Sequence, residues 1–242
     1  MSERSHKLPQ PAERPIETVL EEFLQDQRAR LKANTIRKCE AVIDLFQASL
    51  NHYAYQGLDA SEEALFDRFY DASGSAHREF CQIFGPDKIS ENVGEFLNYF
   101  MVRKVICGKD LLRSSGTVMK KLGRWLGEKG YVGGDEAEIV TDHGADAARD
   151  LPVAEELCSV LMDYADRRTP QCEETVEDHF TLEAVEPGEL HLSGLSAGEG
   201  IVIGVSRAIT DACRTREGWT IAGAIGKTSK GWCLLEVWNV YP

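Results

Sequence analysis

Residues that could carry out catalysis are present, but they lack the spacing that known reactions require. Gly226-Lys227-Thr228 matches the end of a phosphate-binding loop, yet that motif needs a glycine at position 221, where this chain has Ile221. It also needs a helix after the loop, whereas a strand pattern follows here. No Gly-x-Ser-x-Gly motif occurs either. The sequence predicts a protein without an active site of its own; an enzyme whose site no local motif reveals is the third class considered.

The histidines and cysteines do not form a metal site by spacing. None of the six histidines pairs with another His or Cys at metal-ligand spacing, and the chain has no Cys-x-x-Cys pair. The seven cysteines are odd in number and lie far apart, which favours small, buried, reduced thiols. We therefore expect no metal, no cofactor and no disulfide framework.

Charge is distributed unevenly along the chain. The net charge is −13, but residues 1–130 sum to zero, residues 131–200 to −15 and residues 201–242 to +2. Within the neutral part, residues 101–130 hold eight basic side chains against two acidic ones. Neutralising phosphates is the main electrostatic source of nucleic-acid affinity. The predicted nucleic-acid-binding residues are Arg103, Lys104, Lys109, Arg113, Lys120, Lys121 and Arg124.

Part of this basic segment forms a stripe on a predicted helix. On a helix that begins near Ser114 or Ser115, Lys120, Lys121 and Arg124 lie opposite the apolar positions Leu122, Trp125 and Leu126. The alternatives are a solvated helix face, or pairing of these cations with the acidic residues that follow.

Aromatic residues gather near cations at the end of the chain. Strict alternation places Trp232, Leu234, Glu236 and Trp238 on one face of a strand and Cys233, Leu235 and Val237 on the other. Because the second set makes the better core, Trp232 and Trp238 are expected outside, as a stacking platform or an interdomain surface; tryptophan as core is the alternative. The predicted barrel-surface residues are Arg214, Arg216, Lys227, Lys230, Trp232 and Trp238.

The elements that must position these residues change in type along the chain. Helical spacing prevails from Pro15 to Lys129, and alternation begins at Phe180. Three strands, a short helix over 207–213 and two further strands follow the order of an OB-fold, with an SH3-like barrel as runner-up. The predicted class is α+β: an all-helical N-terminal bundle plus a small C-terminal five-stranded β-barrel. We divide the chain into a disordered tail (1–14), a helical bundle (15–132), an acidic connector with one helix from about Ala145 to Arg168 (133–178) and the barrel (179–242).

Two stretches of the front half carry a family resemblance. They are Leu20-Glu-Glu-Phe-Leu-Gln with the later Asn34-Thr-Ile-Arg-Lys-Cys-Glu-Ala-Val-Ile, and the segment from Leu111 to Tyr131. Residues 15–132 resemble the N-terminal SAM-like, core-binding domain of tyrosine recombinases, the phage integrase family. That family places a last helix here whose Thr and basic positions face DNA. It then continues into a catalytic domain with an Arg, a His-x-x-Arg pair and a Tyr nucleophile, but this chain has no His-x-x-Arg. The resemblance implies DNA binding without recombination.

These observations favour a non-catalytic DNA- or nucleic-acid-binding protein that uses a basic helical face. The alternative is a protein–protein adaptor or scaffold that docks a partner on the aromatic barrel face. No run approaches the roughly 18 apolar residues of a membrane helix, and the N-terminus lacks the apolar core of a signal peptide. We therefore expect a cytoplasmic protein with no membrane partner, and the sequence leaves its oligomeric state and its ligand open.

Overall fold

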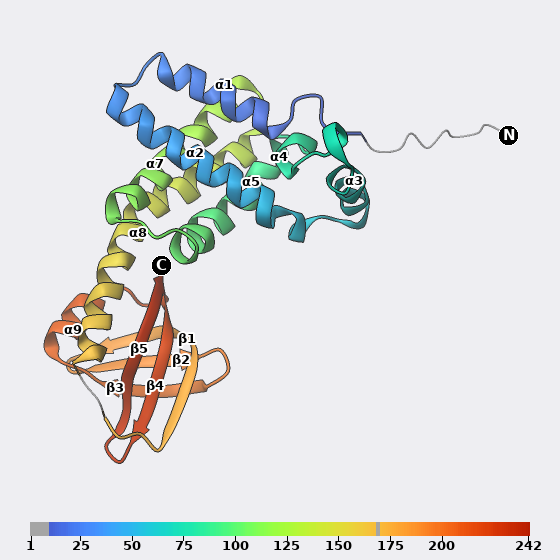
Figure 1. Cartoon of the computed structure of the whole chain (residues 1–242). Helices are drawn as coiled ribbons and strands as arrows, with labels where there is room; N and C mark the ends of the chain where they lie inside the picture. The colour runs from blue at the N-terminus through green and yellow to red at the C-terminus, as the bar shows by residue number, and fades with distance from the viewer. Residues whose placement is uncertain (1–9, 168–169) are drawn as a thin grey trace. The chain divides into compact units, whose positions relative to one another are not determined.

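The computed structural model describes residues 10–167 and 170–242, so most of the expected tail lies outside the described residues. The chain is α+β, with helices first and a five-stranded sheet last, as expected (Figure 1). It forms two compact units. The bundle unit holds Met1–Met101 and Ser114–Ala148, and the barrel unit holds Val102–Arg113 and Arg149–Pro242.

Helices make up the bundle unit and enter the barrel unit. Their order is α1 (Ile16–Arg28), α2 (Ala33–Tyr53), η1 (Ala54–Gly57), α3 (Ala60–Tyr70), η2 (Gly74–Ala76), α4 (Phe80–Ile83), α5 (Asp87–Glu95), the π-helical turn η3 (Phe96–Phe100), α6 (Met101–Arg103), α7 (Lys109–Lys129) and α8 (Gly134–Asp166). The apolar positions that predicted these helices are the buried ones: Phe23, Phe46 and Leu122 are fully covered. Asp59 begins α3 with a capping box, in which its side chain accepts from Ser61 and Glu62.

Helices α7 and α8 approach so closely that their backbones touch. A Cβ atom added to Gly116 would lie 2.2 Å from the backbone nitrogen of Ala148, and one added to Gly144 would lie 2.3 Å from that of Lys120. The contact recurs farther along the two helices, where a Cβ atom added to Gly123 would lie 2.7 Å from the backbone nitrogen of Thr141. Only glycine permits this separation, because any side chain would have to occupy the space of the other helix's main chain.

Helix α8 is longer than the sequence suggested. It is one helix of 33 residues from Gly134, rather than a helix that starts near Ala145, and Pro152 lies inside it. The prediction failed because Gly133-Gly134 and Pro152 both read as helix breakers. Residues of its first half are buried in the bundle unit, as at Val140, and residues of its second half, as at Leu161, are buried in the barrel unit.

The strands close into a small barrel. They are β1 (Glu174–Glu186), β2 (Glu189–Gly194), β3 (Gly198–Gly204), β4 (Thr220–Thr228) and β5 (Gly231–Tyr241), with α9 (Arg207–Cys213) between β3 and β4. The ring order is β1-β2-β3-β5-β4, in which β3 and β5 are parallel and the other neighbours are antiparallel. This agrees with the expected OB-like element order. The barrel begins earlier than predicted, because the acidic residues from Glu174 to Asp178 form the start of β1 instead of a linker.

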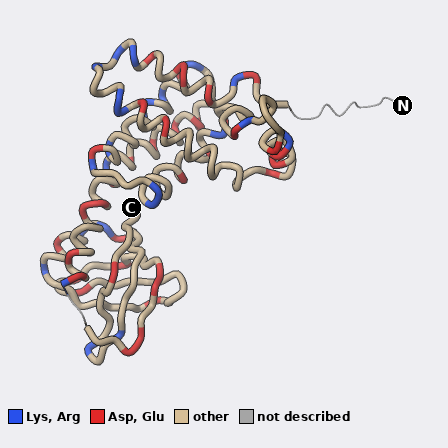
Figure 2. Tube along the Cα trace, in the orientation of Figure 1, with Lys and Arg blue, Asp and Glu red and all other residues tan. Residues whose placement is uncertain are grey.

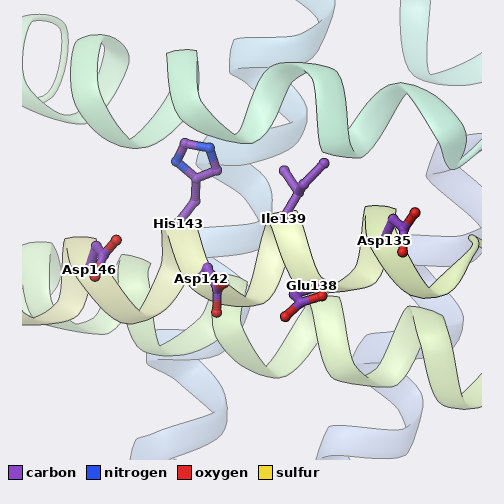
Figure 3. Close-up of a pocket in the computed structure, with 6 residues that line it drawn as sticks. All are labelled: Asp135, Glu138, Ile139, Asp142, His143 and Asp146. Atoms are coloured by element: carbon purple, nitrogen blue, oxygen red, sulfur yellow. The ribbon is translucent and has the colours of Figure 1, made fainter.

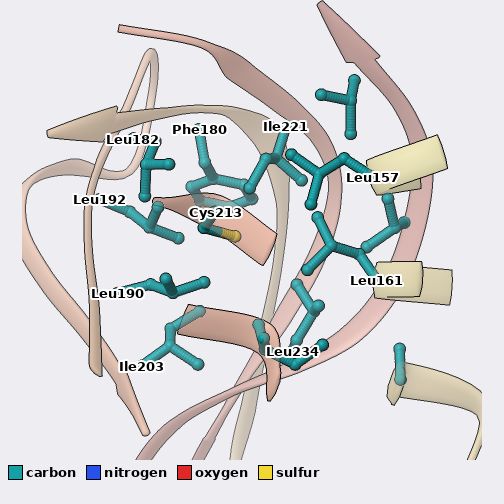
Figure 4. Close-up of a cluster of buried hydrophobic side chains, with 14 of the residues drawn as sticks. Leu157, Leu161, Phe180, Leu182, Leu190, Leu192, Ile203, Cys213, Ile221 and Leu234 are labelled. Carbon is teal, nitrogen blue, oxygen red and sulfur yellow. The ribbon is translucent and has the colours of Figure 1, made fainter. Parts of the chain in front are cut away.

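Helix α8 fills part of the barrel interior. Leu157 and Leu161 lie among the inward-facing residues of the strands, and Cys213 of α9 lies in the same cluster (Figure 4). Each of these three side chains is at most 3 % exposed. The barrel core is therefore completed by helical side chains from outside the sheet.

Strand β5 corrects the predicted alternation. Its buried residues are Leu234, Val237 and Val240, which are spaced by three rather than by two. The pairing of β5 with β4 shifts twice, so that Leu235 and Trp238 are each an extra residue on β5. Such bulges reverse the facing of every residue beyond them. The prediction that Cys233, Leu235 and Val237 form one core face is therefore wrong.

None of the helices in the described part of the chain has the length and apolar composition to cross a membrane.

From the α7–α8 contact we predict that a glycine-to-alanine change inside a helix lowers stability. Replacing Gly144 by Ala should lower stability by about 2 kcal/mol, because the new methyl group forces the two helices apart. Alanine ordinarily stabilises a helix relative to glycine. Urea unfolding followed by far-UV circular dichroism checks this. The matched change Gly134→Ala, whose Cβ meets nothing within 4 Å, should leave the midpoint unchanged or slightly higher; equal behaviour of the two variants would refute the contact.

Candidate nucleic-acid interface

The predicted cations are divided between the two units. Arg103, Lys104, Lys109 and Arg113 belong to the barrel unit, and all four are exposed. Lys109 forms an ion pair with Glu156 of α8, with 3.2 Å between Nζ and Oε2. Lys120, Lys121 and Arg124 belong to the bundle unit. The three cations of the second group lie within five consecutive residues of one helix, α7.

On the bundle unit, α7 presents Lys120, Lys121 and Arg124 along one side. Lys121 and Arg124 are exposed and Lys120 is half-buried, beside the α8 contact. Leu122, Trp125 and Leu126 face inward, as predicted. Within the described ranges, no ion pair involves Lys120, Lys121 or Arg124. Lys121 and Arg124 therefore face solvent, and none of the three cations has an acidic neighbour at ion-pair distance in the described chain.

A polar contact fixes the rotation of α7 against α1. The indole Nε1 of Trp125 donates to Oδ2 of Asp26 at 2.8 Å, and Lys129 Nζ lies 3.0 Å from the same oxygen. The Trp125 ring also packs edge-on against Phe23, with 5.5 Å between ring centroids. Because Leu122 and Leu126 are buried, Arg124, which lies roughly 160° around the helix from each of them, is turned outward. Lys121 lies one turn before Trp125, at the edge of the exposed side.

The corner between α1 and α2 adds cations that the sequence reasoning missed. Trp125 and Lys129 of α7 contact Asp26 in the last turn of α1, so α7 passes close to this corner. Arg28 is paired with Glu21 and Glu40, each at 2.8 Å. Between Asp26 and Glu40 the chain has five basic residues and no acidic one, which was the available signal. Those five residues, all exposed, are Arg28, Arg30, Lys32, Arg37 and Lys38. Figure 2 shows blue segments, which mark Lys and Arg, where α1 is followed by α2.

Acidic residues of α8 lie on another side of that helix. Figure 3 shows Asp135, Glu138, Asp142 and Asp146 along α8, where they line a shallow pocket together with His143. The α7 contacts of α8 come instead from Ala137, Thr141, Gly144 and Ala148. At 100° per residue the two sets are roughly 130° apart around the helix. The acidic stripe therefore does not cover the contact side on which α7 lies.

The barrel surface does not suit a polyanion. An OB-like barrel binds oligonucleotides on β2 and β3 and on the loops that join β1 to β2 and β4 to β5. Here the first of these loops carries Glu186 and Glu189, and their carboxylates lie 3.8 and 3.9 Å from Nε2 of His191. The ligating atoms of these three residues lie within 4.8 Å of one another. This corner would attract cations and repel phosphates.

Most of the predicted barrel cations contact a carboxylate or a tryptophan ring. Arg214 pairs with Asp211 at 2.8 Å, and the guanidinium of Arg216 lies 5.0 Å from the ring centroid of Trp219. Lys227 lies 3.9 Å from a Glu174 oxygen and 5.4 Å from the ring centroid of Trp232. Lys230 is exposed at the β4–β5 turn.

The two tryptophans expected outside the barrel differ in exposure. Trp238 is 41 % exposed on β5, as expected, and its indole Nε1 donates to Glu236 at 3.1 Å. Trp232 is half-buried and packs against the barrel core. A continuous platform of stacked tryptophans is therefore absent from the described surface.

The thiols are placed as inert groups. The described chain has seven free cysteines, of which Cys39, Cys81, Cys158 and Cys213 are buried. Burial raises the pKa of Cys39, Cys158 and Cys213 to about 11 each, so they stay protonated at neutral pH. No thiol among these three has the lowered pKa of a nucleophile.

Comparisons with known proteins identify no family: no protein-family model matches the chain, and no curated protein and no solved structure matches it significantly.

The Asp26 contact predicts a pH-dependent stability. Hydrogen bonding from Trp125, then from Lys129, lowers the pKa of Asp26 from its ordinary value of 3.8. A lowered pKa in the folded state stabilises the fold above pH 3.8, and that stability is lost as the pH falls through the folded-state pKa. Asp26→Asn should therefore lower the urea midpoint at pH 7, and the deficit should shrink towards about pH 2.5. Asp44→Asn, an exposed carboxylate on α2 outside this contact, serves as the control. A deficit that is equal at both pH values would contradict the assignment.

Proposed function

We propose that this chain is a non-catalytic nucleic-acid-binding protein that contacts phosphates with α7 and the α1–α2 corner. The observation that supports it is a group of five cations on α7 and the α1–α2 corner, none of which has an ion-pair partner in the described chain. We call them the phosphate-binding set: Arg30, Lys32, Lys120, Lys121 and Arg124. The expected cytoplasmic location belongs to the same proposal.

The chemistry of this set favours backbone contacts over base readout. Exposed lysines and arginines on a helix and a neighbouring corner match the way that proteins grip phosphates and thereby position themselves on a duplex. If four of the five contact phosphates, the logarithm of the affinity should fall with the logarithm of the salt concentration with a slope of about −3.6 on duplex DNA. Such binding has little sequence preference.

The resemblance of the front half to integrase core-binding domains supports the same proposal. The matching positions include Lys120, Lys121 and Arg124 on the last helix of the resemblance, where that family faces DNA with Thr and basic residues. Here the chain continues into a small barrel in place of a catalytic domain. The proposed protein therefore holds nucleic acid without cutting it.

An adaptor function is the second candidate, and Trp238 is the observation that favours it. A tryptophan that is 41 % exposed on the barrel surface is a common anchor in protein interfaces. The acidic residues of the barrel would then select a partner that carries positive charge. Absence of nucleic-acid binding at about 50 mM salt would favour this candidate.

Charge reversal tests the leading proposal. The triple variant Lys120→Glu, Lys121→Glu, Arg124→Glu should weaken binding of a fluorescent duplex at least about ten-fold at 50 mM salt and reduce the salt slope by about three, because three phosphate contacts are lost. Fluorescence anisotropy titrations at several salt concentrations measure both quantities.

A matched control separates the site from overall charge. The variant Arg207→Glu, Arg214→Glu, Lys230→Glu makes the same change in net charge on exposed positions of the barrel unit. It should retain affinity within about two-fold, because none of its three residues belongs to the phosphate-binding set and salt screens the remaining attraction between exposed charges. Equal loss in the two triple variants would show that no specific face binds.

A further inference from the structure

A pocket lined by carboxylates, in contrast to the cations of the phosphate-binding set, lies at the end of α2. It has a volume of about 460 Å³ and is bordered by residues of α2, η1 and α3, all within the bundle unit. This volume falls in the range of small-ligand sites. Its walls combine aromatic rings with carboxylates, and no lysine or arginine lines it.

The aromatic wall is a stack of rings that reaches solvent. Tyr55 and Phe66 are stacked with 5.7 Å between ring centroids and 6° between planes, and Phe66 and Tyr70 follow at 4.8 Å and 20°. Phe66 is buried, but Tyr55 and Tyr70 are 45 % and 42 % exposed. Core packing explains Phe66 alone, whereas the two tyrosines present ring surface to the pocket.

The acidic wall comes from α3. Glu63, Asp67 and Asp71 follow at intervals of four residues, so they lie along one side of that helix and its C-terminal end. All three are exposed, and in the described ranges no ion pair involves them. Like charges at this spacing repel one another on a helix. A bound cation would relieve the repulsion.

We propose that this pocket binds a positively charged side chain, the guanidinium of an arginine in a basic segment of a partner protein. Arginine combines the two interactions on offer, because its planar group stacks on aromatic rings and its N–H groups donate to carboxylates in pairs. The charge of the pocket excludes phosphates and acidic peptides. The proposal does not depend on the nucleic-acid proposal, since its residues lie outside the phosphate-binding set.

The test uses the full chain and a pair of matched peptides. A blocked Gly-Arg-Gly-Arg-Gly peptide is titrated into the ¹⁵N-labelled protein, in parallel with the same peptide in which citrulline, a neutral isostere, replaces arginine. The arginine peptide should cause saturable NMR shifts at η1 and α3, and the citrulline peptide should cause none. Equal response to both peptides, or no shifts up to about 10 mM arginine peptide, would overturn the proposal.

Variants locate the two walls separately. The double variant Glu63→Gln, Asp67→Asn should lower the affinity for the arginine peptide at least about five-fold. The variant Tyr55→Ala, which removes an exposed ring and leaves the buried Phe66 in place, should lower it by a similar factor. The control Asp44→Asn with Glu128→Gln removes two exposed carboxylates elsewhere on the bundle unit and should change nothing. Equal weakening by this control would show non-specific charge attraction.

A third arm distinguishes a peptide site from a small-molecule site. Free arginine, which carries the same guanidinium without flanking peptide, should bind more weakly than the blocked peptide. If free arginine binds as tightly as the peptide, the proposed occupant is wrong.

Discussion

The backbone contact between α7 and α8 is the constraint on which the candidate interface depends. Gly116 and Gly144 let the two main chains meet, and a side chain at either position would collide with backbone atoms. This contact covers one side of α7, and the Asp26–Trp125 hydrogen bond fixes another side against α1. The remaining side carries Lys121 and Arg124. The packing of the other sides of α7 therefore accounts for the exposure of these cations.

Charge segregation makes a local cationic surface possible on a chain whose net charge is −13. The cations gather on α7 and the α1–α2 corner, whereas carboxylates line one side of α8, the end of α3 and the β1–β2 loop. At physiological ionic strength the Debye length is about 8 Å, so a phosphate on the basic surface is affected mainly by its immediate neighbours. The same segregation leaves a pocket of opposite preference on the same unit.

Much of the fold was available in the sequence, because apolar spacing records which faces are buried. The inward positions of α7, the extent of α9 and the strand–helix–strand order of the barrel were all predicted. What failed depended on tertiary contacts. Helix α8 continues past Pro152 because both halves of the helix pack against buried side chains. The bulges at Leu235 and Trp238 come from the pairing of β5 with β4. The α1–α2 corner was missed because it is far from residues 101–130 in the sequence, and only the fold brings the end of α1 against α7.

The most direct test of the account is an NMR map of the bound surface. The full ¹⁵N-labelled chain is titrated with a duplex of about 20 base pairs at about 50 mM salt, a condition under which phosphate contacts are strong. We expect shifts at residues 120–124 and at the α1–α2 corner, with the β1–β2 loop unaffected. Shifts confined to the barrel, or no shifts at all, would contradict it.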